Sequence, residues 1–276
     1  MTDSTNLSDQ EKRPGLIGPC GTLIRREIVR FLRQRSRVIG ALGTPLIFWL
    51  MVGGGLGRSF TTGGESSGID YLEYTFPGAL AAILLFTSIF SMISIIDDRR
   101  EGFMQGVLVA PVSRLAIVLG KVIGATVLAV GQACIFLLLA PFATITLSVS
   151  MLAATLAAMV LIGIAVTALG FWLAWIMDST QGFHAVMNMV LMPMLILSGA
   201  FFPPSGSAAI VRWITFVNPM TYAVSLLRHA IYVSQPGAAV NSIGFVTALL
   251  VTLCFAVSML LFSIFLASRE SARALN

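Results

Sequence analysis

Residues 122–177 read VIGATVLAVGQACIFLLLAPFATITLSVSMLAATLAAMVLIGIAVTALGFWLAWIM, which is 56 positions without an aspartate, glutamate, lysine or arginine. A helix rises about 1.5 Å per residue, and about 20 apolar residues cross the hydrocarbon core of a bilayer. The stretch therefore holds two membrane spans, and Pro141 predicts the turn between them. Across the 276 residues, 57% are hydrophobic and 11% are charged, against about 25% charged in soluble domains. This composition excludes a soluble enzyme and predicts an integral membrane protein.

Four further charge-poor runs have the length of a span. They bring the predicted spans to six, at residues 38–57, 75–96, 116–140, 151–176, 183–202 and 242–267. The runs are apolar on every side instead of alternating, so helices are expected and not the strands of a barrel. We predict an all-α polytopic membrane protein with six transmembrane helices. Its transmembrane domain covers residues 38–269, between cytoplasmic tails at 1–21 and 268–276.

The distribution of basic residues predicts the orientation. With the N-terminus in the cytoplasm, 14 of the 17 lysines and arginines lie in cytoplasmic segments, and Arg58, Arg212 and Arg228 lie outside. An excess of basic residues marks the cytoplasmic side of membrane proteins. Both termini are therefore expected in the cytoplasm, with the chain in the cell inner (plasma) membrane. No apolar run precedes Val38, so we expect no cleavable signal peptide, and the first span acts as the insertion signal.

Residues 22–37 predict an amphipathic helix before the first span. Ile24, Ile28 and Phe31 recur at helical spacing, and arginines line another face. A basic amphipathic helix beside a membrane lies in the headgroup layer, where it contacts membrane lipids. The alternative is a basic anchor that only sets the topology. The two roles are compatible.

The cytoplasmic loop after the second span contains a second amphipathic segment. The acids at its start and Pro111 at its end predict a short helix from Asp98 to Ala110, with Phe103 and Val107 on one side. This helix is too charged to cross the bilayer. It either lies flat on the membrane or fills a groove in a partner protein.

The external segment before the sixth span is apolar but interrupted by proline and glycine. Its pieces, Ala208–Val217 and Met220–Val233, are too short to cross, and they suit interfacial or re-entrant helices. Trp213, Tyr222 and Tyr232 are the aromatic residues expected at the membrane interface.

No catalytic, cofactor-binding or metal-binding motif is present in the sequence. Gly120-Lys121 is followed by Val122, and Leu115 stands where the first glycine of a phosphate-binding loop belongs. The three cysteines and two histidines are scattered, so no ligand cluster is predicted. The basic charge does not indicate nucleic acid, because it lies beside the spans. We expect a protein that is not an enzyme and carries no cofactor.

Polar and small residues within the spans predict helix contacts. Gln132 and Asn188 are expected to bond between neighbouring helices, and Gly53/Gly57 and Gly120/Gly124 permit close approach of helices. Ion-coupled carriers usually bury a charged residue along their route, and here Asp178 alone comes close, at a helix end. An ion-coupled carrier or channel without an ATPase is the alternative to a transporter powered by a partner subunit.

Two pairs of motifs resemble those of a known family. Residues 101–105 (EGFMQ) and 110–114 (APVSR) resemble the cytoplasmic signature of type-2 ATP-binding-cassette (ABC) transporter permeases. Residues 197–203 (LSGAFFP) and 218–222 (NPMTY) are similar to the segment around the fifth span of drug, antibiotic and nodulation-type exporters in that family. The resemblance extends from about Leu23 to Arg269.

The resemblance implies a function and partners. The chain would be the membrane-spanning permease subunit of an exporter, with a coupling helix after the second span that docks on a separate ATPase subunit. It would pair with a second copy of itself or a paralogous permease. The residues expected at the ATPase contact are Arg99, Arg100, Glu101, Gly102, Phe103 and Val107. The residues that mark the external re-entrant segment are Pro203, Asn218, Pro219 and Tyr222.

Overall fold

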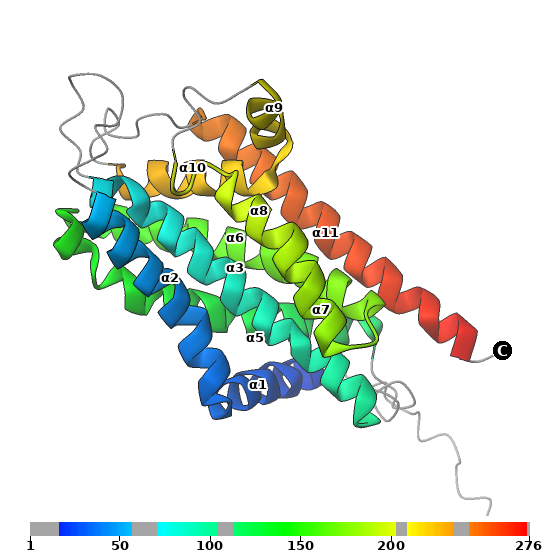
Figure 1. Cartoon of the computed structure of the whole chain (residues 1–276). Helices are drawn as coiled ribbons and strands as arrows, with labels where there is room; N and C mark the ends of the chain where they lie inside the picture. Colours follow the sequence, from blue (N-terminus) through cyan, green and yellow to red (C-terminus); the bar gives the residue numbers. More distant parts are fainter. Residues whose placement is uncertain (1–16, 57–70, 104–112, 203–208, 234–242, 275–276) are drawn as a thin grey trace, which may run out of the picture.

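The computed structural model describes residues 17–56, 71–103, 113–202, 209–233 and 243–274. This part of the chain forms helices joined by turns, and it contains no strand (Figure 1). Five of its helices are long and apolar enough to cross a membrane. The prediction of an all-α polytopic membrane protein is confirmed.

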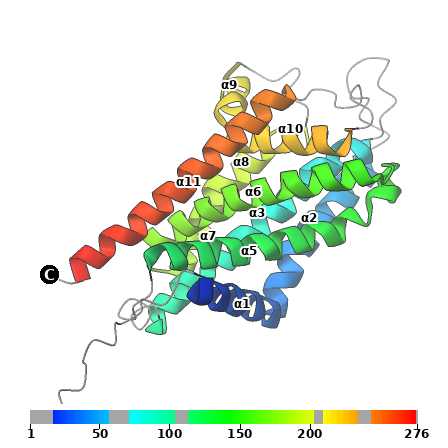
Figure 2. The ribbon, with the colours of Figure 1, turned by 180° about the vertical axis from the view of Figure 1, so that it is seen from behind.

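Helix α3 (Tyr71–Arg100) is the centre of the bundle. Of its 30 residues, 24 are buried, and at about 1.5 Å per residue it is about 45 Å long. Helices α2 (Arg35–Leu56), α5 (Arg114–Leu137) and α6 (Val149–Ile176) pack on α3, and α11 (Phe245–Ala274) packs mainly on α6. Figure 2 shows α5, α6 and α11 from behind. An apolar helix buried on all sides is the expected core of a membrane bundle.

The turn between α5 and α6 lies where Pro141 predicts it. A short 3-10 helix, η1 (Ala140–Ala143), ends at Thr144, whose φ of 59° is left-handed. The Ser148 side chain then accepts a hydrogen bond from the Met151 backbone N–H and caps α6. The charge-free stretch therefore forms two helices with a tight turn.

Helix α1 (Ile17–Arg33) lies across one end of the bundle, as Figure 1 shows. It begins before the expected residue 22 and ends at Arg33, because residues from Arg35 onwards belong to α2. It packs on α5 at Gly120 and Gly124; a Cβ at Gly120 would lie 2.7 Å from Leu23 Cβ. The predicted close approach at this glycine pair is confirmed.

The span expected at residues 183–202 corresponds to an unbroken helical run over residues 180–196 that contains a π-turn, and residues 197–202 are turns and bends. The segment consists of α7 (Thr180–Val186), the π-helix η2 (Met187–Leu191) and α8 (Met192–Ile196), followed by turns. Proline in a regular helix lacks an N–H and clashes with the carbonyl four residues earlier. The π-turn before Pro193 gives that ring room, and Met192 N–H donates to Met187 O. The helical run of Thr180–Ile196 is about 25 Å long.

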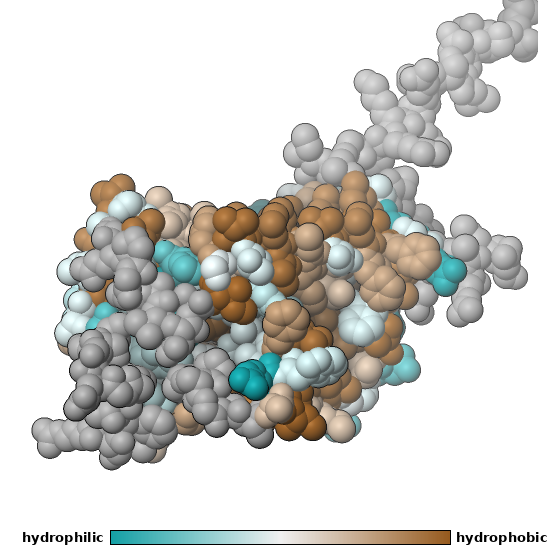
Figure 3. All heavy atoms as spheres, turned by 90° about the horizontal axis from the view of Figure 1, so that it is seen from above, coloured by the Kyte–Doolittle hydropathy of each residue, from teal (hydrophilic) through white to brown (hydrophobic). Residues whose placement is uncertain are grey.

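Two short helices lie at the other end of the bundle. Helices α9 (Ala209–Val217) and α10 (Pro219–Ile231) meet at an angle of 75°. Trp213 of α9 is 68% exposed, and other apolar residues of this helix are exposed as well, including Ile210 and Phe216 at 71% and 69%. Figure 3 shows hydrophobic side chains on the face of the molecule seen from above. Tyr222 and Tyr232, also expected at the membrane interface, are buried within the bundle and donate to the backbone oxygens of Phe216 and Glu73.

Candidate functional site at the charged end of the bundle

A buried ion network joins α1, α3 and α5 at one end of the bundle. Lys121 Nζ lies 2.7 Å from Glu27 Oε2 and 2.7 Å from Asp98 Oδ2, and it donates to Ser94 Oγ at 2.9 Å. The side chains of Lys121, Glu27 and Asp98 are at most 2% exposed. We call Glu27, Asp98, Lys121 and the serines around them the buried network. It connects three helices through charged hydrogen bonds.

Two arginines of α1 complete the pairing of Asp98. Arg26 donates to both Asp98 oxygens, at 2.6 Å and 3.0 Å, and Arg30 also bonds this carboxylate. The hydrogen bond to Asp98 raises the pKa of the Arg26 guanidinium above its ordinary value, against the effect of burial. Arg37 of α2 pairs with the neighbouring Asp97 at 3.2 Å. Buried charges persist only when they are paired and hydrogen-bonded, and these are.

This network corrects the expectation that only Asp178 approaches a buried charge. The Asp178 side chain is 96% exposed, whereas Asp98 and Glu27 are buried. The expectation treated α1 as a surface helix and Asp98 as part of a loop. The structure instead packs α1 on α5, which brings its one acid, Glu27, to Lys121.

The predicted start of the cytoplasmic helix at Asp98 is also wrong, because α3 continues to Arg100. Acids at a helix C-terminus are opposed by the helix dipole, and here the surrounding arginines and Lys121 compensate. Gly102, with a φ of 75°, ends the helical course, since this conformation suits glycine. Residues 104–112, with Val107, lie outside the described residues.

Arg99 and Arg100, expected at the ATPase contact, reach the end of α6 and the loop after it. Arg99 donates to Trp175 O at 2.6 Å and to Met177 O at 3.5 Å. Arg100 donates to Asp178 O at 3.3 Å. These bonds tie the end of α3 to the loop between α6 and α7.

Glu101 and Phe103 face α1 instead. Glu101 Oε1 accepts from Arg30 at 3.2 Å, and the guanidinium of Arg26 lies 3.6 Å from the centre of the Phe103 ring. Phe103 remains 37% exposed. The end of α3 is thus held by α1 on one side and by the α6–α7 loop on the other.

The second pair of motifs lies at the opposite end of the molecule. Arg228 of α10 donates to Gly199 O at 2.7 Å, and its guanidinium lies 4.3 Å from the centre of the Tyr74 ring. Tyr71 donates to Phe201 O at 2.6 Å. A Cβ at Gly78 would lie 2.3 Å from Ala200 O, so the loop rests directly on the backbone of α3.

The bend between α9 and α10 is built by Asn218 and Pro219. The Asn218 side chain accepts from Met220 N–H and donates to Met194 O at 2.5 Å. Pro219 occupies the first turn of α10, where its missing N–H costs nothing. Pro203 lies outside the described residues. The motif residues therefore cap α10 and hold α8 and α10 together at this end of the bundle.

The polar residues within the bundle bond only partly as expected. Thr87 Oγ1 donates to Gln132 Oε1 at 2.5 Å, which confirms the bond between α3 and α5. Asn188 is exposed on the outside of the bundle. Among the described residues, no three histidine, cysteine or acidic side chains come together as metal ligands.

Sequence reasoning missed Glu27 and Lys121 as site residues. A signal for each was present: Glu27 is the one acid among the arginines of residues 22–37, and Lys121 stands directly before the charge-free stretch. A lone charge on the apolar side of a pattern indicates a partner elsewhere in the fold. The sequence does not identify the partner of either residue, because the crossing of α1 over α5 depends on tertiary packing.

Comparisons with known proteins give a consistent result. Residues 19–232 match the family described as ABC-2 type transporter. A Cyanophora paradoxa protein named as a transport permease, ycf38, is 26% identical over 75% of this chain and 71% of its own length. Nodulation protein J of Rhizobium meliloti (strain 1021) is 27% identical over 70% of this chain and 73% of its own. An Escherichia coli (strain K12) protein named as a multidrug ABC transporter permease, YbhR, is 24% identical over 58% of this chain and 44% of its own.

Proposed function

Because the chain belongs to the ABC-2 type transporter family, we propose that it exports its cargo with energy from ATP hydrolysed on a separate subunit. Membership makes the chain a membrane-embedded permease subunit of an ABC transporter with an ATPase partner. The cargo we propose is an amphipathic drug, a lipid or a polysaccharide. The names of two relatives refer to nodulation and to multidrug transport.

The observation that supports ATP-driven coupling most is the meeting of three segments at the charged end. Helix α1 bonds Asp98 at the end of α3 and Glu101 just after it, and Arg99 of α3 bonds the end of α6, next to the α6–α7 loop. A force applied to any one of them reaches α3, the central helix, through short charged contacts. We therefore place the ATPase at this end, which is cytoplasmic in the predicted orientation.

Within this surface, Phe103 is the proposed anchor. It is exposed to 37% and its ring is already oriented by Arg26, so little side-chain freedom is lost on binding. Phe103 and Val107 enter an apolar groove of the ATPase, and Arg99, Arg100 and Glu101 lie at the rim of that contact. Arg99 and Arg100 also bond the end of α6 and the loop after it. These bonds hold the end of α3, from which the contact segment extends.

A second copy or a paralogous permease pairs with this chain across the faces of α2 and α8. In the single chain, large apolar side chains are exposed on these two faces. They include Ile47 and Met51 of α2 and Ile196 of α8. Contiguous exposed apolar surface of this kind suits either lipid or another subunit. We propose the subunit, because half a translocation path has to be completed by another half.

The second candidate function is an ion-coupled carrier, and the buried Glu27 and Asp98 carboxylates are the observation that favours it. Both carboxylates, however, are paired with cations at one end of the bundle. A carboxylate that binds a transported ion has to exchange partners, whereas these have several fixed ones. The family membership favours the ATP-driven exporter.

Reconstitution tests the proposal. Vesicles that contain the chain alone should show neither ATP hydrolysis nor transport, whereas vesicles with the ATPase subunit should move a fluorescent amphiphile when ATP is added. Transport by the chain alone, driven by a proton or sodium gradient, would favour the carrier instead. The two functions are thereby distinguished in one preparation.

A further inference from the structure

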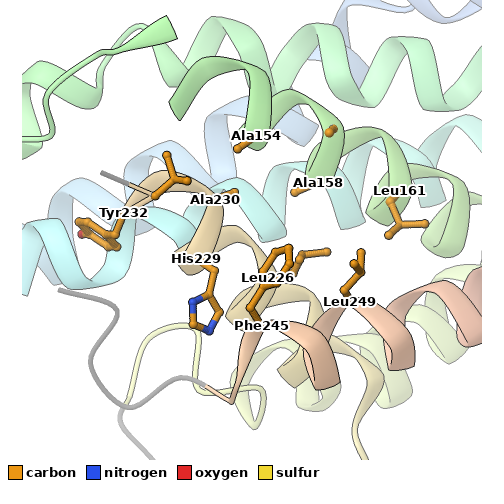
Figure 4. Close-up of a pocket in the computed structure, with 11 residues that line it drawn as sticks. Ala154, Ala158, Leu161, Leu226, His229, Ala230, Tyr232, Phe245 and Leu249 are labelled. Carbon is orange, nitrogen blue, oxygen red and sulfur yellow. The ribbon is translucent and has the colours of Figure 1, made fainter. Parts of the chain in front are cut away.

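A cavity of about 420 Å³ lies between α6, α10 and α11, away from the charged end. Figure 4 shows its walls, with Ala154, Ala158 and Leu161 from α6 opposite Leu226 of α10 and Leu249 of α11. Ligand sites in proteins commonly measure about 300–1,000 Å³. The cavity therefore has the size of a binding site and is separate from the network and the motif loops described above.

The space exists because α6 presents alanines to it. Ala154, Ala157 and Ala158 line the cavity at positions i, i+3 and i+4, which is one face of a helix. A larger side chain at any of them would occupy the volume. Helix interfaces are otherwise packed as densely as organic crystals. If the cavity were empty, the side chains that line it would lack many van der Waals contacts.

The walls of the cavity are mostly apolar. Among the lining residues, His229 and Tyr232 carry the polar side-chain atoms, and both are used within the chain. His229 Nε2 bonds Ile243 O at 2.7 Å, and Tyr232 donates to Glu73 O at 3.4 Å. The remaining lining side chains are alanine, valine, leucine and phenylalanine. A ligand there gains from burial of apolar surface and not from recognition of a charge.

The cavity lies where the bilayer is expected. The cavity lies between two helices, α6 and α11, that are long and apolar enough to span a membrane. Exposed apolar residues flank it, including Leu156 and Val160 of α6 and Leu250 of α11. Such faces contact lipid tails. The occupant therefore reaches the cavity from the hydrocarbon region.

We infer that this cavity binds one alkyl chain, either of a membrane lipid or of a free amphiphile dissolved in the same leaflet. The chain lies against the alanine face of α6 with its far side on Leu226 and Leu249. It joins α10, which carries Arg228, to two long helices, and so it contributes to the position of the loop at Gly199. The inference rests on the chain spanning a bilayer and does not depend on the export function.

Photolabelling of the full chain in lipid nanodiscs tests the site. One sample contains phosphatidylethanolamine with a diazirine on an acyl chain, and a second contains free palmitic acid with the same group. Peptide mass spectrometry should find the label on the lining residues of α6 and α10. Labelling by the phospholipid alone assigns the site to bilayer lipid, labelling by the fatty acid alone assigns it to a free amphiphile, and labelling by both supports an alkyl site open to either.

Matched variants separate the cavity from ordinary contact with lipid. Ala157→Phe fills the cavity and should lower the labelling of its walls about tenfold, which corresponds to about 1.4 kcal/mol of binding. Ala153→Phe adds the same ring to an exposed position of α6 outside the lining and should leave the labelling unchanged. Val233→Trp, at the rim on the other wall, provides a second variant should Ala157→Phe fail to fold. The inference is overturned if the walls are labelled no more than other lipid-facing residues, or if a folded cavity variant labels like the native chain.

Discussion

Replacing Lys121 with methionine tests whether the buried network holds α1 on the bundle. Methionine has a similar unbranched stem but no charge, so the change removes the ion pairs and little volume. Asp98 keeps its bonds to Arg26 and Arg30, whereas Glu27 is left with the hydroxyls of Ser91 and Ser94, at 3.3 Å and 2.5 Å. The substitution therefore mainly affects Glu27, whose carboxylate loses its cationic partner.

The size of the effect follows from the burial of Glu27, which is 2% exposed. Removing one partner of a buried ion pair costs about 3–5 kcal/mol, because a buried charge is left uncompensated. We expect a loss of about 3 kcal/mol, at the lower end of this range, since two hydroxyls still donate to Glu27. For a chain of this size, such a loss lowers the melting temperature by about 6–12 °C.

Thermal unfolding of the purified chain in detergent measures this loss. Arg33→Met is the matched control, because it removes an exposed cation from α1 and should change the melting temperature by about 1 °C or less. Adding Glu27→Gln to Lys121→Met removes the uncompensated charge and should restore at least half of the lost stability. A native melting temperature for Lys121→Met, or no recovery in the double variant, would refute the role assigned to the network.

Three further predictions concern topology, packing and the opposite end of the bundle. In a background without native cysteines, a cysteine at Thr146 should react with an impermeant thiol reagent added to whole cells, and one at the exposed Asp178 should not. Gly120→Ala should lower the melting temperature, because its Cβ would lie 2.7 Å from a side chain of α1, whereas Gly131→Ala has open space and should be neutral or stabilising. Arg228→Ala should destabilise by about 2 kcal/mol in thermal unfolding, because it removes the cation over the Tyr74 ring and the 2.7 Å bond to Gly199 O, which keeps the longer bond from Tyr74 OH at 3.4 Å.

Each of these has a result that would count against it. Equal labelling of both cysteines from outside would overturn the predicted orientation. Equal melting temperatures for the two glycine variants would mean that α1 and α5 do not pack as described. A fully stable Arg228→Ala chain would show that the loop at Gly199 is held by other contacts.

The helical bundle could be predicted because the membrane imposes a simple rule on the sequence. A backbone in lipid has to satisfy its own hydrogen bonds, so each charge-poor run of sufficient length becomes a helix. The rule succeeded for α2, α3, α5, α6 and α11. Over residues 183–202 the rule also predicts a helix, but composition does not reveal the π-turn before Pro193 or the end of the helix at Ile196. Local backbone chemistry decided the outcome there.

The candidate site was only partly predictable. The motif at residues 101–105 directed attention to the end of the bundle where the buried network lies, and Phe103 is exposed there. Asp98 was assigned to the start of a helix because acids favour that position. In the structure it belongs to the end of α3, where Lys121 and two arginines outweigh the dipole. Contacts between helices distant in sequence carry that information, and a local pattern does not.

The most direct test of the proposed coupling surface is the affinity of the purified chain for its ATPase subunit, measured with native Phe103 and with Phe103→Ala. Loss of an aromatic anchor at an interface centre costs about 2 kcal/mol or more, so the dissociation constant should rise about 30-fold. Phe142→Ala removes the same ring from an exposed site, 75% exposed, at the opposite end of the bundle and should bind like the native chain. If Phe103→Ala binds the ATPase as tightly as Phe142→Ala does, the coupling contact does not lie at the end of α3.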